Sequence, residues 1–172
     1  VPDDADLISR GVSRGLEVAD AVIVTGGTSV GERDLVPEAI SRVGEIIAHG
    51  LAIRPGKPTG FAVASGKPIF MLSGFPVAAL IGFQELVIPA LEHMLGCKFD
   101  PLPGIRGKLT RRVASLPGVR TYVRVRVFRQ DDGEVLIEPL RVTGSGILST
   151  LTRGNGLLVI PEGLEGYDEG SE

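Results

Sequence analysis

The chain has 172 residues, 43% of them hydrophobic, and a formal net charge of −3. This length allows one good hydrophobic core or two small ones, while the negative charge and the absence of tryptophan argue against a nucleic-acid binder, which usually shows a basic face. The start, Val1–Asp4, is not a signal peptide, and no apolar run reaches membrane-spanning length without charges or breakers. We therefore expect a cytoplasmic globular protein with neither a membrane nor a nucleic acid as a partner.

The first half of the chain predicts helices that alternate with strands. Acidic residues open a helix near Pro2, and its apolar side carries Leu7 and Val12. The run Ala21–Val24 has the continuous apolar character of a central, buried parallel strand. A second helix is expected over residues 35–43, where a glycine follows as the stop signal.

Three short strands are expected next, over residues 45–53, 59–64 and 68–72, the last two joined by a hairpin-like turn. Residues 76–95 predict the longest helix, which Pro89 should bend or divide. Strands interleaved with helices over residues 1–97 indicate a three-layer α/β domain with a mostly parallel sheet. Because such a domain normally opens with a strand and a helix, whereas this chain opens with a helix cap, we expect an N-terminally incomplete domain.

The second half of the chain has a different pattern. Prolines and glycines make residues 98–106 a linker by composition. Residues 107–172 then predict short strands and tight turns, typical of a small all-β, barrel-like domain. The strand over residues 120–128 alternates between apolar and polar residues, which predicts one buried and one wet face. The predicted buried residues are Val123, Val125 and Val127, and the predicted exposed ones are Arg124 and Arg126.

A glycine-rich loop follows the first expected strand. Gly26 and Gly27 can adopt positive φ and let backbone N–H groups converge on an anion, while Thr28 and Ser29 add hydroxyl donors. Asp34 then places a carboxylate where Mg²⁺ would reconcile it with a bound phosphate. The loop has neither the Walker A spacing nor the dinucleotide-binding spacing. An ordinary turn explains the glycine pair alone equally well.

Two further segments have the composition of anion sites. Arg54 and Lys57 flank a Pro-Gly turn and so form a rigid cationic corner that suits an oxyanion, with a solvated surface turn as the alternative. Further along, a strand ends at Ser73 and Gly74 and a helix begins at Pro76, which leaves helical N–H groups facing the end of the sheet.

These segments together resemble one family. The loop Thr25–Asp34 resembles the signature loop of the molybdopterin-binding domain shared by MogA, MoaB, MoeA and gephyrin. The segment Ala52–Pro58 is similar to the Pro-Gly-Lys-Pro segment that separates MoeA and gephyrin from MogA. The helix-start motif departs from the family's Pro-Gly-Asn-Pro-Val-Ser at Ser73, Phe75 and Ala78. Either the backbone does the binding there and the side chains are dispensable, or the protein has a modified ligand or a weakened activity.

The resemblance covers residues 1–97, which are similar to the pterin-binding domain of MoeA, and residues 105–172, which are similar to its C-terminal β domain. It implies a molybdopterin molybdotransferase, which inserts molybdate or tungstate into adenylylated molybdopterin and releases AMP. By this resemblance the catalytic positions are Asp34, Arg54 and Lys57, the last two at the molybdate site. The residues that would hold the pterin phosphates are Gly26, Gly27, Thr28, Ser29, Gly31, Ser73, Gly74 and Pro76. Mg²⁺ would be bound by Asp34 with Asp3 or Asp4, a pair that an ordinary helix N-cap explains equally well.

Other functions stay open at this point. A MogA-like adenylyltransferase shares the glycine loop, but it lacks the cationic corner and the appended β domain. A non-catalytic pterin-binding scaffold, as in gephyrin, is the alternative outside the enzymes. The resemblance also implies a homodimer in the full-length protein and a MogA- or MoaB-type partner. We expect this chain by itself to bind the ligand without turning it over.

Overall fold

The computed structural model describes residues 1–27, 35–140 and 149–172, without the side chains of residues 149 and 150. Its contacts divide the chain into two compact units. The first unit comprises Val1–Leu51 and Gly56–Gly96, and the second comprises Ala52–Pro55 and Cys97–Glu172. The segment Ala52–Pro55 therefore belongs to the second unit, although the sequence places it inside the first expected domain.

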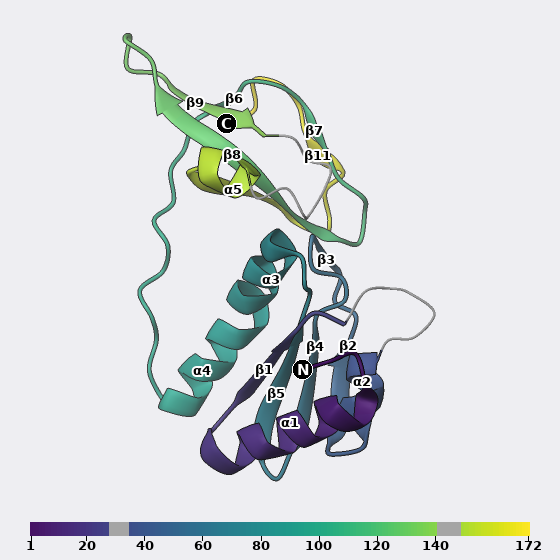
Figure 1. Cartoon of the computed structure of the whole chain (residues 1–172). Helices are drawn as coiled ribbons and strands as arrows, with labels where there is room; N and C mark the ends of the chain where they lie inside the picture. The colour runs from purple at the N-terminus through teal and green to yellow at the C-terminus, as the bar shows by residue number, and fades with distance from the viewer. Residues whose placement is uncertain (28–34, 141–148) are drawn as a thin grey trace. The chain divides into compact units, whose positions relative to one another are not determined.

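The first unit is a three-layer α/β fold, in which one mixed sheet lies between two layers of helices (Figure 1). Its strands are β1 Val22–Thr25, β2 Glu45–His49, β4 Gly60–Ala64 and β5 Lys67–Leu72, in the spatial order β1-β5-β4-β2. Its helices are α1 Ala5–Val18 and α2 Leu35–Ser41 on one face, and α3 Pro76–Gly82, the π-helical turn η1 Phe83–Val87 and α4 Ile88–Leu95 on the other. The three-layer prediction is confirmed.

The sequence predicted a mostly parallel sheet, but the sheet is mixed. Among the described strands only β1 and β5 run parallel, whereas β5 and β4, and β4 and β2, are antiparallel. The reason is local, because Ser65 and Gly66 adopt positive φ, 52° and 74°, and form the two-residue turn of a β-hairpin. In the described sheet β1 is an edge strand with Ile23 43% exposed, not the fully buried central strand expected.

Strand β5 is central to the packing of this unit. Its successive side chains point to opposite faces of the sheet, as the two-residue period of a strand requires. Ile69 and Met71 pack with residues of α1 and α2, whereas Phe70 and Leu72 pack with residues of η1 and α4. All four are at most 3% exposed, so β5 joins the two apolar clusters that hold the three layers together.

The helix over residues 76–95 is continuous but not uniform. Pro89 has no N–H to donate to the carbonyl four residues earlier, and the wider turn η1 directly precedes α4. The predicted interruption is thus confirmed, and Gly96, with φ 63°, caps the end of the helix. By length and composition alone this helix could cross a membrane. Val77 and Ile81 are nevertheless fully buried, as in the core helix of an α/β layer.

A buried hydroxyl in this unit leads to a stability prediction. Thr59 is fully buried beside Gly82, and among the described residues its Oγ1 has no hydrogen-bond partner. Because an unsatisfied buried hydroxyl costs about 1–3 kcal/mol, Thr59→Val should raise the free energy of unfolding by about 1 kcal/mol in denaturant melts. Thr121→Val is the matched control and should destabilise, since Thr121 is also buried but its Oγ1 lies 2.6 Å from the Ser115 hydroxyl. A stability loss with Thr59→Val would show that its hydroxyl is satisfied.

The second unit is a β domain with one short helix, α5 Ser149–Arg153, which the sequence did not predict. Its strands are β3 Ile53–Arg54, β6 Lys108–Leu109, β7 Val113–Ala114, β8 Arg120–Arg129, β9 Val135–Pro139, β10 Gly156–Ile160 and β11 Gly166–Tyr167. The long strand β8 pairs antiparallel with β9 and β10 and parallel with β3. Strands β7 and β11 form a separate two-stranded ribbon.

Strand β8 is buried on both faces over residues 121–125. Val123 and Val125 enter the core of this unit, as predicted, at 0% and 2% exposed. Arg124 was predicted to face water but is only 3% exposed, so that prediction is wrong, whereas Arg126 is exposed as expected. The alternation identifies the core face but does not exclude that the polar face is covered as well. Burial lowers the pKa of the Arg124 guanidinium from its ordinary value.

Candidate functional site

The two predicted phosphate loops follow strands that run side by side in the same direction. Strands β1 and β5 are parallel, and Thr25 at the end of β1 is in register with Leu72 at the end of β5. Because the carboxyl ends of parallel strands open at one edge of a sheet, the loops that follow them start at that edge. Gly26 and Gly27 have φ of 86° and 66°, so the positive φ that their roles require is present.

The two loops touch each other through a pair of glycines. A Cβ atom added to Gly74 would lie 3.1 Å from the Cα atom of Gly26, which is closer than side chains normally approach. The Gly26 N–H donates a hydrogen bond to the Leu72 carbonyl at 3.2 Å and ties the first loop to the end of β5. Since this amide is engaged by the backbone, Gly26 shapes the loop and its N–H is not available to an anion.

The second loop is held by a short side-chain to backbone hydrogen bond. Ser73 is 5% exposed, and its Oγ accepts a hydrogen bond from the Phe75 N–H at 3.2 Å. Gly74 lies between these two residues and is exposed, and Pro76 begins α3 directly afterwards. The Ser73 hydroxyl therefore stabilises the turn, while the exposed part of this loop is mainly Gly74 and the ring of Phe75.

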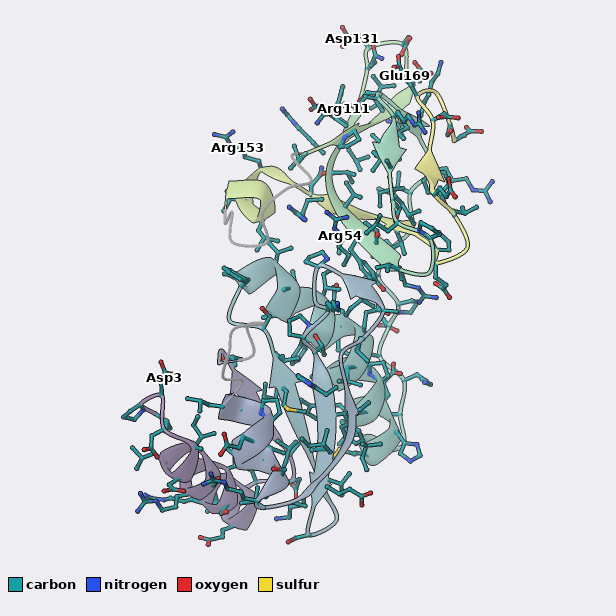
Figure 2. The ribbon with its side chains drawn as sticks, turned by 90° about the vertical axis from the view of Figure 1, so that its right-hand side faces the viewer. Asp3, Arg54, Arg111, Asp131, Arg153 and Glu169 are labelled. Atoms are coloured by element: carbon teal, nitrogen blue, oxygen red, sulfur yellow. The ribbon has the colours of Figure 1, made fainter. Side chains whose placement is uncertain are left out.

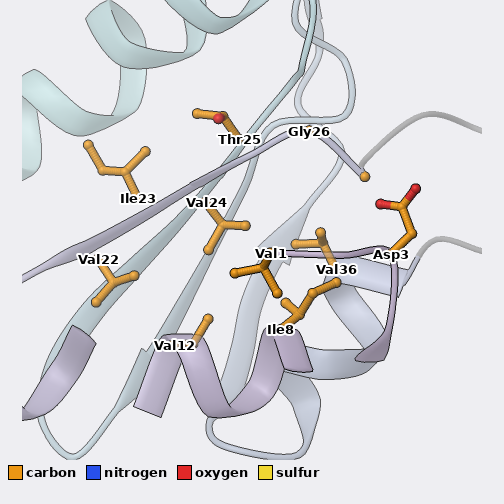
Figure 3. A pocket seen from close by; sticks show the side chains of 12 residues that line it. Val1, Asp3, Ile8, Val12, Val22, Ile23, Val24, Thr25, Gly26 and Val36 are labelled. Atoms are coloured by element: carbon orange, nitrogen blue, oxygen red, sulfur yellow. The ribbon is translucent and has the colours of Figure 1, made fainter. Parts of the chain in front are cut away.

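A pocket of about 400 Å³ opens beside the first loop (Figure 3). Its walls are mostly apolar, and Val22 and Val24 of β1 point into it toward α1. The polar side chains among its lining residues are those of Asp3 and Thr25, and the backbone of Gly26 and Gly27 lines it as well. An apolar pocket with a few polar groups at one end is the common form of a small-molecule site.

The two acidic residues before α1 differ in their surroundings. Asp4 is the N-cap of α1, because its Oδ1 accepts a hydrogen bond from the Leu7 N–H at 2.9 Å. Asp3 is exposed and lines the pocket together with Gly26 and Gly27 (Figures 2 and 3). Mg²⁺ takes hard carboxylate oxygens together with substrate phosphates, so Asp3 fits a metal position. Over residues 1–27, 35–140 and 149–172, no group of three or more metal-ligating side chains forms a complete site.

The predicted cationic corner is divided between the two units. Arg54 ends β3 in the second unit, where its partner in the sheet register is Thr121. Lys57 belongs to the first unit, where its carbonyl accepts a hydrogen bond from the Leu51 N–H at 2.9 Å. Both side chains are exposed. Arg54 and Lys57 thus belong to different units, and their close spacing in the sequence does not reveal this.

Four predicted site residues, Thr28, Ser29, Gly31 and Asp34, lie outside the described residues, and their roles stay predictions. The sequence also gave no signal for the contact between Gly26 and Gly74. The chain has 24 glycines, and only the parallel pairing of β1 with β5 identifies these two as neighbours.

Comparison with known families identifies the family to which the chain belongs. Residues 1–93 match the family described as a probable molybdopterin binding domain. The matched residues are more than half of the chain. The chain belongs to this family. Residues 106–172 match the MoeA C-terminal region, domain IV. A molybdopterin-binding domain followed by this β domain is the combination predicted from the glycine loop and the cationic corner, and the predicted MoeA resemblance is confirmed.

Relatives and solved structures agree with this membership. A Methanocaldococcus jannaschii protein named for molybdopterin biosynthesis is 42% identical over 99% of this chain and 39% of its own length. A molybdopterin molybdenumtransferase of Staphylococcus aureus is 32% identical over 98% of this chain and 40% of its own length. The crystal structure of a MoeA protein from Pyrococcus horikosii is 33% identical, with a TM-score of 0.77 over 98% of this chain and 39% of that one. The chain thus spans about two fifths of the curated relatives.

Proposed function

We propose that this chain supplies the pterin-phosphate site of a molybdopterin molybdenumtransferase. That enzyme would take adenylylated molybdopterin and molybdate, or tungstate, and release AMP. The observation that carries the proposal is the contact between Gly26 and Gly74, which brings two glycine loops together at the carboxyl ends of β1 and β5. Ligands of α/β sheets bind at this edge. Membership of the molybdopterin-binding family and the transferases among the relatives support the same substrate class.

The residues at this edge would have distinct roles. Gly26, Ser73, Gly74 and Pro76 shape the two loops, while Gly27, Thr28, Ser29 and Gly31 would donate hydrogen bonds to the phosphates of the ligand. Mg²⁺ would be held by Asp34 and Asp3, and when bound it supplies the positive charge that offsets the phosphates. Arg54 and Lys57 would bind the oxyanion, the arginine as a planar donor and the lysine as a point charge.

The setting of the reaction follows from the substrates. Both are small and strongly anionic, so the cationic corner and the metal would provide the charge that brings them together. We place the activity in the cytoplasm, in a homodimer that receives its adenylylated ligand from a MogA- or MoaB-type protein.

A calorimetric titration of the chain with adenylylated molybdopterin tests the proposal. We expect binding that depends on Mg²⁺, because Asp3 and Asp34 would hold the metal and its charge would offset that of the phosphates. Turnover is tested on the full-length protein, since this chain by itself is expected to bind without turning the ligand over. Adding molybdate to that protein and measuring AMP separates the transferase from an adenylyltransferase, which would consume ATP instead. A chain that binds no adenylylated molybdopterin in the presence of Mg²⁺ would overturn the proposed function.

The two acidic residues before α1 allow a matched test of the metal position. Asp3→Asn should weaken Mg²⁺-dependent binding about tenfold, because a neutral amide replaces a metal-ligating carboxylate, and Asp34→Asn should act in the same way. Asp4→Asn should change neither binding nor stability, since asparagine caps a helix as well as aspartate does. Equal losses from Asp3→Asn and Asp4→Asn would exclude a specific role for Asp3.

The glycine contact gives a separate prediction for ligand binding. Gly74→Ala places a Cβ atom 3.1 Å from Gly26 Cα, so the two loops must move apart by a few tenths of an ångström. We expect about tenfold weaker binding in the same titration, with little change in the thermal midpoint because Gly74 is exposed. Gly104→Ala is the control, since nothing lies within 4 Å of an added Cβ there. Unchanged affinity of the Gly74→Ala chain would show that the contact does not set the geometry of the site.

A further inference from the structure

An exposed aromatic residue, Phe75, directly follows in the chain the Gly74 of the glycine contact. Phe75 is 53% exposed, although large apolar side chains are usually placed inside. It follows Gly74, which packs against Gly26. Phe75 therefore belongs to the same loop that lies at the carboxyl ends of β1 and β5, where the phosphates are expected to bind. A single exposed phenylalanine needs no explanation on an ordinary surface. At the edge where the ligand is expected to bind, it is a group that the phosphate-binding role does not use.

The backbone that carries this ring is fixed on both sides. The Phe75 N–H donates to the Ser73 Oγ at 3.2 Å, and the Phe75 carbonyl accepts from the Ala79 N–H at 2.9 Å. Ser73 is itself buried at 5% exposed, so the first of these hydrogen bonds is anchored in the interior. A phenylalanine has only two side-chain dihedral angles to order, so a ring on a fixed backbone contacts a ligand at low entropic cost.

The chemistry of the side chain identifies the part of a ligand that it suits. A phenyl ring donates no hydrogen bond and carries no charge, so it does not serve a phosphate or an oxyanion. It offers an apolar face on which a planar heteroaromatic ring can stack. The family motif to which this loop is similar has an asparagine at this position, which hydrogen-bonds but offers no such face. A phenylalanine at this position therefore offers a face for stacking, where an asparagine would offer directional hydrogen bonds.

We propose that Phe75 is a specificity-determining residue, which stacks on a planar nitrogen heterocycle of the phosphate ligand. This inference rests on the proposed function, because the phosphates would be held by the adjoining loops. The ligand class is a heterocycle joined to phosphate, and the pterin and the adenine of adenylylated molybdopterin both have that chemistry. Binding energy from stacking would then add to phosphate binding and favour ring-bearing ligands over inorganic pyrophosphate.

Three ligands distinguish these contributions in calorimetric titrations of the full chain with Mg²⁺. Molybdopterin carries only the pterin, AMP carries only the adenine, and pyrophosphate carries no ring. For Phe75→Ala we expect about tenfold weaker binding of at least one ring-bearing ligand and unchanged binding of pyrophosphate. Phe75→Tyr should retain the wild-type affinities, and Phe75→Asn should behave like Phe75→Ala. The ligand that loses affinity identifies the stacked ring.

Two controls separate stacking from general effects. Phe99→Ala removes another exposed phenylalanine, 46% exposed and located in the second unit, and should change no affinity. Thermal melts of each variant should match the wild type, because Phe75 is largely outside the core. Equal affinities of Phe75→Ala and the wild-type chain for both ring-bearing ligands would overturn the stacking inference and leave the phosphate site intact. If the wild-type chain bound none of the three ligands, the phosphate site itself would be wrong, and the inference with it.

Discussion

Val125→Asp is expected to unfold the second unit at a lower denaturant concentration, with a loss of more than about 3 kcal/mol in its free energy of unfolding. Val125 is 2% exposed and packs in the core cluster of this unit. An aspartate there would have to bury a charge among apolar side chains or be held protonated, and both cost free energy. Tyrosine fluorescence measures this transition selectively, because the chain has no tryptophan and its two tyrosines, Tyr122 and Tyr167, both lie in the second unit.

The same substitution at an exposed valine of the same sheet is the control. Val159 lies on β10, which pairs with β8, and is 41% exposed. Val159→Asp should change the free energy of unfolding by less than about 1 kcal/mol, because its carboxylate stays in water. If Val159→Asp were the more damaging of the two, the assignment of the core face of this sheet would be wrong by one residue in register.

Arg124→Asp is expected to destabilise the second unit by more than about 2 kcal/mol, although the sequence alone predicts a neutral change. Arg124 is 3% exposed, so an aspartate there would place a carboxylate in a desolvated position. Arg126→Asp makes the same change two residues along β8 at an exposed position, and should stay within about 0.5 kcal/mol of the wild type.

A third variant separates the charge of Arg124 from its volume. Arg124→Met removes the guanidinium but keeps a long side chain, and replacing buried charge with apolar volume is often close to neutral. We therefore expect Arg124→Met to retain more stability than Arg124→Asp in the same tyrosine-fluorescence melts. Equal effects of Arg124→Asp and Arg126→Asp would contradict the burial of Arg124.

Several features of the first unit could be predicted because they depend on neighbours in the sequence. Asp4 caps α1 through a hydrogen bond to Leu7, three residues away. Gly96 ends the long helix in the left-handed conformation that its position requires. Gly26 and Gly27 have the positive φ that their loop needs. Each of these features follows from the conformational preference of one residue within one turn of chain.

The errors concern residues whose environment is set by distant segments. The sequence signalled the turn between β4 and β5, but it did not show that β4 also pairs antiparallel with β2. With that pairing, β1 and β5 are the one parallel pair among the described strands of this sheet. Arg124 is buried because β8 is covered on its polar face as well as its apolar face. Alternation reports which side chains are apolar, but it does not report what lies against the polar side.

The sequence by itself determined the family, the order of helices and strands in the first unit, and the residue types of the candidate site, because glycine loops, caps and short motifs act through local conformation. Only the tertiary structure decided that Gly26 lies against Gly74, that Asp3 lines the pocket, and that Arg54 belongs to the second unit. These are contacts between segments far apart in the chain. They depend on which strands pair and which faces are covered, and both are settled by burial of apolar surface over the whole fold.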